Sequence, residues 1–304
     1  MAENKLIPLA FGQIKDLVSS MNNEYRFIHH SFGFVKSFAG VKDVIQQWAF
    51  FEQPYRLIEG RIMYLFKGEA CINLNLRERH LKAPMAIVIS PGTIGEIKSF
   101  SSDCDFSMFA FQNSFMDSFR RESLLQLYSQ RRLCLCIPLQ ETDRLRMETL
   151  WNLFWDILHD QPLPEEMIKE MILLIFRQID VYRQQYSSDN KQTVSRQEDV
   201  LNHFIDLVNE YAIQERKIPF YADKLCLTPH YLSTIIRKTS HQTIMDWINR
   251  AVIQEAKLLL RHSNLQISQI SDKLNFPNVS FFCKFFRRLT GMSPGEYQKS
   301  TTQR

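Results

Sequence analysis

The stretch ISQISDKLNFPNVSFFCKFFRRLTGMSPGEYQ, residues 267–298, decides the fold of the C-terminal part. Ile267–Leu274 has the spacing of a short helix, Phe276 is the apolar residue of a turn, and Asn278 is a suitable cap for a second helix. We assign to the buried face of that helix Phe281, Phe282, Phe285, Phe286 and Leu289. We assign to its exposed face Ser280, Cys283, Lys284, Arg287 and Arg288. This layout predicts a helix-turn-helix over about 267–290.

A second copy of this layout lies 49 residues earlier, as the repeated triplet DKL shows, in ADKLCLTPHYLSTIIRKTS at Ala222–Ser240. Thr228 is a good N-cap and Pro229 suits the first helical position, which predicts a helix-turn-helix over about 218–240. Its outer face holds His230, Ser233, Thr234, Arg237 and Lys238. A plain helical bundle with solvated outer faces is the alternative. The duplication favours DNA binding, because both copies keep the same division of faces.

The segment between the copies, Ile244–Ser263, is one unbroken helical pattern. About 19 residues at 1.5 Å each give roughly 28 Å, comparable with the roughly 34 Å repeat of the major groove. We therefore expect a long helix that holds two recognition helices at a spacing suited to successive grooves of one duplex.

Residues 200–298 resemble the DNA-binding domain of the AraC/XylS family of bacterial transcription regulators. The resemblance rests on ADKLCLTPHYLSTIIRK, on EAKLLL, and on the stretch quoted first, with its aromatic pair, its basic pair and its terminal GMSPGEY. The chain departs from the family pattern in four places. Asn275 and His241 stand where glycine is usual, Val252 stands where the linker helix usually has arginine, and the usual arginine after Tyr297 is missing. Asn also tolerates a left-handed turn conformation.

By position, the resemblance implies two sets of base-reading candidates. They are His230, Ser233, Thr234 and Arg237 in the first recognition helix, and Val279, Ser280, Cys283 and Lys284 in the second. Arg and Lys can donate to guanine, Ser and Thr can read either base type, and Val can meet a thymine methyl. We assign Lys238, Arg287 and Arg288 to phosphates.

The charge distribution agrees with a polyanionic partner for the C-terminal third. Residues 196–304 hold 15 Lys and Arg against 10 Asp and Glu, whereas the whole chain holds 37 against 33. Double-stranded promoter DNA is the partner we expect.

The rest of the chain predicts a second domain, so we expect an α+β protein with two domains. Residues of about 20–135 read as short alternating strands with regular turns, typical of a sandwich or small barrel. The region of about 141–185 has helical spacing broken at Pro162–Pro164, which predicts a helical hairpin. We place this domain at 1–185, a polar linker at 186–197, and the DNA-binding domain at 198–304.

The family resemblance implies that the N-terminal domain is a cupin-like β-barrel that senses a small molecule, with a helical pair that forms a homodimer. It also implies RNA polymerase as a partner. The candidate ligand-binding residues are Tyr55, Arg61, Tyr64, Phe66, Phe109 and Phe111. Core filling is the alternative for each aromatic side chain. The effector is not identified by the sequence, and a barrel that only dimerises remains an alternative.

A cupin-fold enzyme is the other alternative. Metal-dependent cupins use a His-x-His pair, which this chain lacks, and adjacent His29 and His30 would point to opposite faces of a strand. The six cysteines are scattered without a CxxC pair. We therefore expect no metal, no cofactor and no enzymatic activity. The chain has no apolar run of roughly 18 residues and no signal layout at its start, so we expect no membrane association and a cytoplasmic protein.

Overall fold

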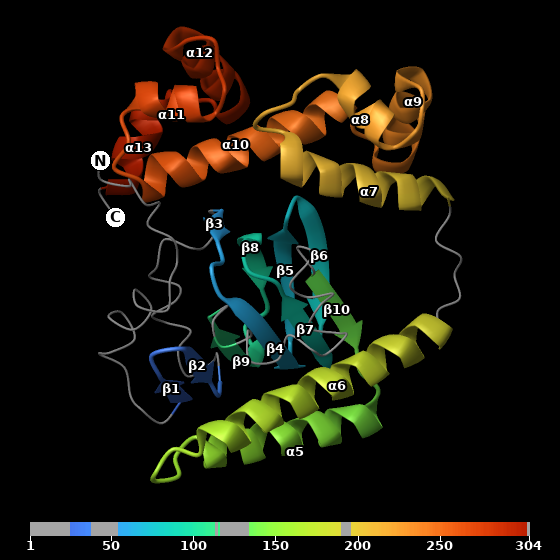
Figure 1. The fold of residues 1–304 in the computed structure, drawn as a ribbon, viewed down its shortest axis with the longest axis vertical. Helices are drawn as coiled ribbons and strands as arrows, with labels where there is room; N and C mark the ends of the chain where they lie inside the picture. The colour runs from blue at the N-terminus through green and yellow to red at the C-terminus, as the bar shows by residue number, and fades with distance from the viewer. Residues whose placement is uncertain (1–24, 38–53, 113–114, 116–133, 190–195, 303–304) are drawn as a thin grey trace. The chain divides into compact units, whose positions relative to one another are not determined.

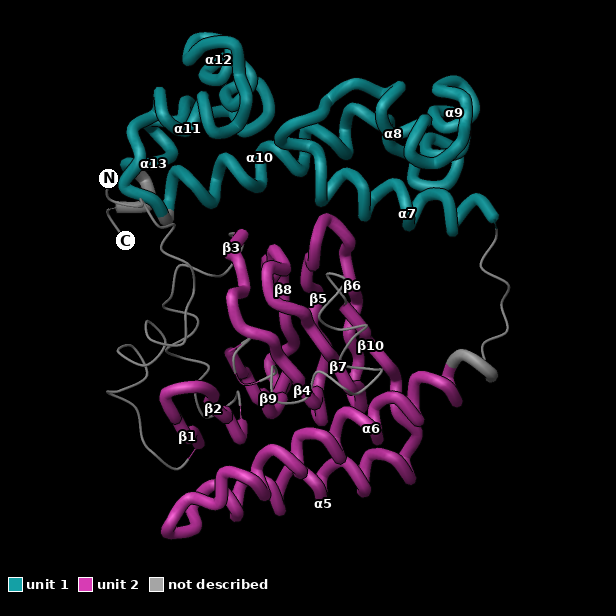
Figure 2. Tube along the Cα trace, viewed as in Figure 1, with its two compact units in different colours: residues 1–7, 192–304 teal, residues 8–191 magenta. Residues whose placement is uncertain are grey.

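A computed structural model describes residues 25–37, 54–112, 115, 134–189 and 196–302 (Figure 1). The chain divides into two compact units, residues 8–191 and residues 192–304, coloured separately in Figure 2. The predicted linker, 186–197, begins within the last residues of one helix, 186–189, and ends within the first two residues of the next, 196–197. Residues 190–195 lie outside the described residues. Residues 1–24, 38–53, 113–114 and 116–133 of the predicted N-terminal domain also lie outside them.

The N-terminal unit contains two antiparallel sheets. The six-stranded sheet has the order β1-β2-β9-β4-β7-β10 and the four-stranded sheet the order β3-β8-β5-β6. The strands are β1 (Arg26–Ile28), β2 (Phe32–Val35), β3 (Tyr55–Arg56), β4 (Gly60–Lys67), β5 (Glu69–Leu74), β6 (Arg77–Lys82), β7 (Met85–Ile89), β8 (Ile94–Phe100), β9 (Asp105–Phe111) and β10 (Cys134–Pro138).

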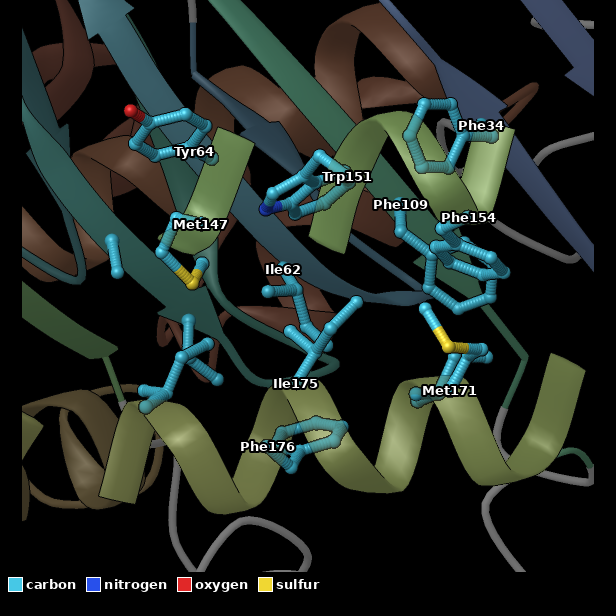
Figure 3. Close-up of a cluster of buried hydrophobic side chains, with 14 of the residues drawn as sticks. Phe34, Ile62, Tyr64, Phe109, Met147, Trp151, Phe154, Met171, Ile175 and Phe176 are labelled. Atoms are coloured by element: carbon cyan, nitrogen blue, oxygen red, sulfur yellow. The ribbon is translucent and has the colours of Figure 1, made fainter. Parts of the chain in front are cut away.

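Alternation along the strands gives the six-stranded sheet two apolar faces. On β4, Ile62 and Tyr64 pack with the helices α5 (Glu141–Ile157) and α6 (Glu165–Asp189), whereas Leu65 belongs to the core shared with the four-stranded sheet. Figure 3 shows the helix-facing cluster, in which Trp151 and Phe154 of α5 lie beside sheet residues. Both faces of this sheet are therefore covered, and the unit has three layers.

The barrel expectation needs a correction. Among the described strands no pairing joins the edges of the two sheets, so they do not form a closed barrel, which requires hydrogen bonding all the way round.

The turn from β4 to β5 depends on Gly68, with φ of +75°. A Cβ there would lie 2.6 Å from the Cα of Cys104. The α+β class with antiparallel sheets in the N-terminal part and helices in the C-terminal part is confirmed.

The two adjacent histidines also differ from expectation. His29 and His30 follow β1 in the turn to β2 rather than lying on a strand, and their ring centroids are 3.9 Å apart. The rule that neighbouring strand residues face opposite sides therefore does not apply to them. His29 also contacts the Phe32 ring at 4.6 Å, and its Nδ1 lies 3.2 Å from the Ser31 hydroxyl.

The C-terminal unit is helical. Its elements are α7 (Arg196–Tyr211), α8 (Ile218–Lys224), α9 (Pro229–Ser240), α10 (Ile244–His262), α11 (Ile267–Lys273), α12 (Val279–Thr290) and α13 (Pro294–Thr302). The long helix that joins the two helix-turn-helix units is α10, as predicted. None of the helices in the described ranges has the length and apolar character that a membrane crossing needs.

The long helix α10 has a strong start signal. Thr243 accepts a hydrogen bond from the Asp246 backbone N–H, and the Asp246 carboxylate accepts one from the Thr243 backbone N–H at 2.8 Å. The Thr243 hydroxyl also donates to this carboxylate at 2.7 Å, and this bond, followed by the one from the Thr243 backbone N–H, lowers the pKa of Asp246. Toward its other end α10 packs Ala256, Leu259 and Leu260 into a core with α11 and α12. The helix α10 is therefore itself part of the core of the second helix-turn-helix unit.

Candidate nucleic-acid interface

The two turns of the C-terminal unit have the same backbone geometry. In the first turn the Leu227 N–H donates to Ala222 O at 2.9 Å, and in the second the Phe276 N–H donates to Ser271 O at 3.0 Å. Each turn contains one residue with positive φ, Cys226 in the first and Asn275 in the second. The repeat seen in the sequence is therefore also a repeat of structure, in the hydrogen bond that closes each turn and in its left-handed residue.

The second helices of the two units also begin and end alike. Thr228 caps α9 by accepting from the Tyr231 N–H, and Asn278 caps α12 by accepting from the Phe281 N–H. Both helices end on a left-handed residue, His241 with φ of 57° and Gly291 with φ of 81°. His241 thus adopts the conformation for which glycine is usual at that position.

On α9 the structure places the sequence-predicted residues on the accessible side. Exposed side chains are His230, Thr234, Arg237 and Lys238, and Ser233 is half-buried. The Ser233 hydroxyl donates to Pro229 O and the Thr234 hydroxyl donates to His230 O, at 2.8 and 3.0 Å. Each hydroxyl oxygen keeps its acceptor capacity for a group outside the helix.

On α12 the predicted residues are exposed or half-buried. Ser280, Lys284, Arg287 and Arg288 are exposed, while Val279 and Cys283 are half-buried. The Arg288 guanidinium lies 5.8 Å from the Phe285 ring centroid. Hydrogen bonds from Ser293, with a smaller contribution from the charge of Arg287, lower the pKa of Glu296. In the described part of the chain, Arg237, Lys238 and Lys284 make no ion pair, so their charge is available to a partner.

Two residues assigned to the buried face of α12 are in fact exposed. Phe281 is 60% exposed and Leu289 42% exposed, whereas Phe282 and Phe286 are fully buried. Tyr231, at the position of α9 equivalent to Phe281, is 46% exposed. Sequence reasoning missed these aromatic residues because it treated the aromatic pair as one core feature. The signal available in the sequence was that each of these aromatic residues is the third residue of its helix.

A contact between the segment that precedes α8 and the second turn was also missed. Arg216, in the segment between α7 and α8, donates to Leu274 O in the second turn and stacks on Phe276 at 4.1 Å. The Asn275 side-chain amide donates to Gln214 O at 3.2 Å. Burial lowers the pKa of Arg216. This contact therefore ties the segment that leads into the first helix-turn-helix unit to the second turn, in addition to the connection through α10.

The six candidate ligand residues of the N-terminal unit do not come together. Tyr64, Phe66, Phe109 and Phe111 lie on the helix-facing side of the six-stranded sheet, and Tyr55 packs on the other side, in the core between the sheets. By strand alternation Arg61 shares that inner side with Met63 and Leu65. Phe109 and Phe111 are fully buried and fill the core.

Tyr64 and Phe66 do line a cavity of about 280 Å³ beside α5. Its polar lining includes Lys36 and Glu148. The Tyr64 hydroxyl lies 3.4 Å from Glu148 Oε1, and Arg144 forms ion pairs with both Glu148 and Glu141 at 2.5 Å. Burial, followed by the charge of Glu148, raises the pKa of Tyr64, so this hydroxyl stays protonated. The cavity thus combines aromatic walls with groups of both charges.

Comparison with known proteins bears on the C-terminal unit. Residues 221–300 match the model of a helix-turn-helix domain. The chain is 27% identical over 108 residues to the uncharacterized HTH-type transcriptional regulator YijO of Escherichia coli, covering 36% of this chain and 38% of that protein. It is 28% identical over 152 residues to the HTH-type transcriptional activator RhaR of Escherichia coli, covering 48% of this chain and 52% of that protein.

The matched part therefore spans about half or less of these relatives. Among solved structures, ToxT from Vibrio cholerae aligns over 90% of this chain and 96% of its own, with 15% identity and a TM-score of 0.37. The curated relatives are transcription regulators rather than enzymes, in line with the sequence-based preference. With its duplicated units, its match to the helix-turn-helix model and its similarity to the curated regulators, the C-terminal part of the chain is a helix-turn-helix domain of the AraC type.

Proposed function

We propose that this protein is a sequence-specific DNA-binding transcription regulator that inserts α9 and α12 into successive major grooves of promoter DNA. The observation that carries this proposal is the matched pair of helix-turn-helix units. Both turns share a closing hydrogen bond and a left-handed residue, and both second helices expose polar and basic side chains. The recognition helix of such a motif contacts base edges through its N-terminal residues. The Arg216 contact and α10 give the two helices a fixed spacing.

The base and phosphate contacts assigned from the sequence remain part of this proposal. They are His230, Ser233, Thr234, Arg237, Lys238, Val279, Ser280, Cys283, Lys284, Arg287 and Arg288. Lys284 is exposed on the α12 face that would meet base edges, whereas Arg287 and Arg288 lie one turn further along. Lys284 should therefore affect sequence preference, and Arg288 should affect overall electrostatic attraction.

The test is to select the preferred duplex from a random DNA library and to titrate it across a range of salt concentrations. Lys284→Ala should weaken binding by about 1–3 kcal/mol and relax specificity at one base position. Arg288→Ala should weaken binding to all sequences and reduce the salt slope by about one. Lys299→Ala on α13 removes an equally exposed positive charge outside both recognition helices, and should bind like wild type. Normal binding and salt slopes in both α12 variants would refute the proposal.

The N-terminal unit is proposed to bind a small-molecule effector, which biases the arrangement of the two domains on DNA. The cavity beside α5 supports this role, because Tyr64 and Trp151 offer apolar surface and Lys36 and Glu148 offer charged groups. A thermal-shift screen of sugars, fatty acids and bile-type steroids tests it, since a sensor should show selective stabilisation. A uniform lack of stabilisation would instead favour a unit that only dimerises.

The helical hairpin is proposed to form a homodimer. Met167, Leu174 and Val181 of α6 are each more than 40% exposed and recur every seven residues, the spacing of a helix–helix interface. RNA polymerase is proposed as the protein partner at the promoter, and the bacterial cytoplasm as the place of action, because a regulator of this kind works on the chromosome.

A further inference from the structure

The hairpin of β5 and β6 brings together three side chains whose atoms are suited to bind a metal ion. Cys71 lies directly opposite His80 in the strand register, and Glu78 lies two residues before His80 on the same face. The Cys71 sulfur, a Glu78 carboxylate oxygen and a His80 ring nitrogen all lie within 4.8 Å of one another. Thiolate, imidazole and carboxylate are the three ligand types that zinc takes in proteins.

The geometry of this cluster agrees with a tetrahedral site. With metal–ligand bonds of about 2.0–2.3 Å, neighbouring ligand atoms of a tetrahedral zinc site lie about 3.3–3.8 Å apart. The His80 Nε2 and Glu78 Oε1 atoms are 3.3 Å apart. The Cys71 sulfur lies within 4.8 Å of each of these two atoms. The three groups therefore lie close enough to reach a common ion by adjusting side-chain angles, with the paired strands unchanged.

Asn73 provides a second and independent observation. It lies opposite Glu78 in the register and shares the face of Cys71, so its Cβ is within about 4.5–5.5 Å of the Glu78 Cβ. Asn73 is only 1% exposed, yet within the described ranges neither atom of its amide group has a hydrogen-bond partner. A buried amide without partners is costly. A metal ion, or water bound to it, would provide a partner for this group.

We propose that Cys71, Glu78 and His80 form a binding site for a zinc-class divalent metal ion, with Asn73 Oδ1 or a water molecule in the fourth position. The site lies on the outer face of the four-stranded sheet, because Ala70, Ile72 and Leu74 of β5 point to the core between the sheets. It is thus separate from the sheet interior that a cupin enzyme would use. The bound ion would link β6, an edge strand, to β5.

The surroundings of the site are mixed in charge. Glu96 of β8 lies opposite Asn73 and forms an ion pair of 2.7 Å with Lys98, whose charge also acts on Cys71. When metal binds, Cys71 releases its thiol proton to solvent and ligates the ion as the thiolate. With Glu96 and Lys98 paired, the ligand set then carries two negative charges, which balance a divalent cation.

The test uses full-length, tag-free protein that has been reduced and stripped of metal, titrated with Co²⁺ and then with Zn²⁺. We expect one Co²⁺ per chain with a thiolate-to-cobalt charge-transfer band, displaced by one equivalent of Zn²⁺. Cys71→Ser and His80→Gln should each abolish the band. They should weaken Zn²⁺ binding by more than about 100-fold, beyond the loss expected for an outer-shell partner. Glu78→Gln serves in place of either variant that fails to fold.

Matched controls separate this site from other thiols and imidazoles. Cys226→Ser removes an exposed thiol of the C-terminal unit, His203→Gln removes an exposed imidazole of α7, and Cys134→Ser removes a thiol of β10. All three should keep the band and the stoichiometry. Absence of the band in wild type overturns the proposal. Two further results overturn the proposal as well. One is a band that survives in Cys71→Ser, and the other is a band that is lost in Cys134→Ser but kept in Cys71→Ser.

Discussion

Cys226 and Asn275, 49 residues apart, hold the same left-handed backbone conformation, with φ of 55° and 56°. Each backbone N–H donates to an aspartate carbonyl three residues earlier, Asp223 O at 3.0 Å and Asp272 O at 2.9 Å. The left-handed region costs most L-residues roughly 1–2 kcal/mol, and Asn pays less because its side chain can bond locally. The two turns therefore share a geometry but differ in how well their residues suit it.

Cys226→Gly should stabilise the first helix-turn-helix unit. Relief of the left-handed strain exceeds the entropic cost of glycine, about 0.5–1 kcal/mol, so the expected gain is up to about 1 kcal/mol. Asn275→Gly should bring no gain, because it removes the Asn275 amide hydrogen bond to Gln214 O. Hydrogen exchange of α8 and α9 in the full-length protein measures the first effect. Faster exchange in Cys226→Gly than in wild type would contradict it.

Arg216→Ala should loosen the spacing between the two recognition helices. The substitution removes the hydrogen bond to Leu274 O and the stacking on Phe276, with a loss of about 1–3 kcal/mol for a charged, partly buried donor. On duplexes whose two half-sites are shifted by one base pair, wild type should lose affinity more steeply than Arg216→Ala. Lys217→Ala, an exposed neighbour, is the control. Identical spacing profiles for the two variants would show that α10 alone sets the distance.

Phe281→Ala and Phe282→Ala should separate DNA binding from folding. Phe282 is fully buried, so its truncation should lower the free energy of unfolding by about 3–5 kcal/mol. Phe281 is mostly exposed, so its truncation should change that free energy by no more than about 0.5 kcal/mol. At the N-terminal end of α12 it can contact a thymine methyl, and its loss should weaken DNA binding. Urea unfolding and DNA titration measure the two quantities. A large stability loss in Phe281→Ala would restore the buried assignment.

The sequence predicted the C-terminal unit well because its signals are local. Caps such as Thr228 and Asn278, and the repeated turn, depend on residues within a few positions of one another. The sequence did not predict the features that depend on packing between distant segments. The spacing of the aromatic pair alone could not separate Phe281 from Phe282, because exposure depends on where the neighbouring helices end. The Arg216 contact joins residues 58 positions apart, and no local pattern reveals it.

The N-terminal unit shows the same division. Alternation along β4 was evident in the sequence, but the register that sets Cys71 opposite His80, and the split of the strands into two sheets, follow from pairing between segments. Tyr64 and Arg61 were grouped as candidate ligand residues by type. The structure places them on different faces, because their positions differ by an odd number.

Leu174→Glu should disrupt the proposed homodimer. Leu174 is the middle residue of the exposed series Met167, Leu174 and Val181 on α6, at 46% exposure, while its neighbours Ile175 and Phe176 are buried. A carboxylate at the centre of an apolar interface would have to be desolvated without a partner, which costs several kcal/mol. The substitution should leave the fold intact, because the side chain points away from the core of its own chain.

Sedimentation equilibrium of the full-length protein measures the effect, with circular dichroism to verify the fold. Gln184→Glu on the same helix introduces the same charge at an exposed polar position, and it should remain dimeric like wild type. The control is demanding, because it separates the effect of charge on α6 from the effect of charge within the apolar series. A dimer that persists in Leu174→Glu at wild-type affinity would place the subunit contact elsewhere, and the exposed apolar residues of α5, Leu145 and Leu153, would then be the next surface to change.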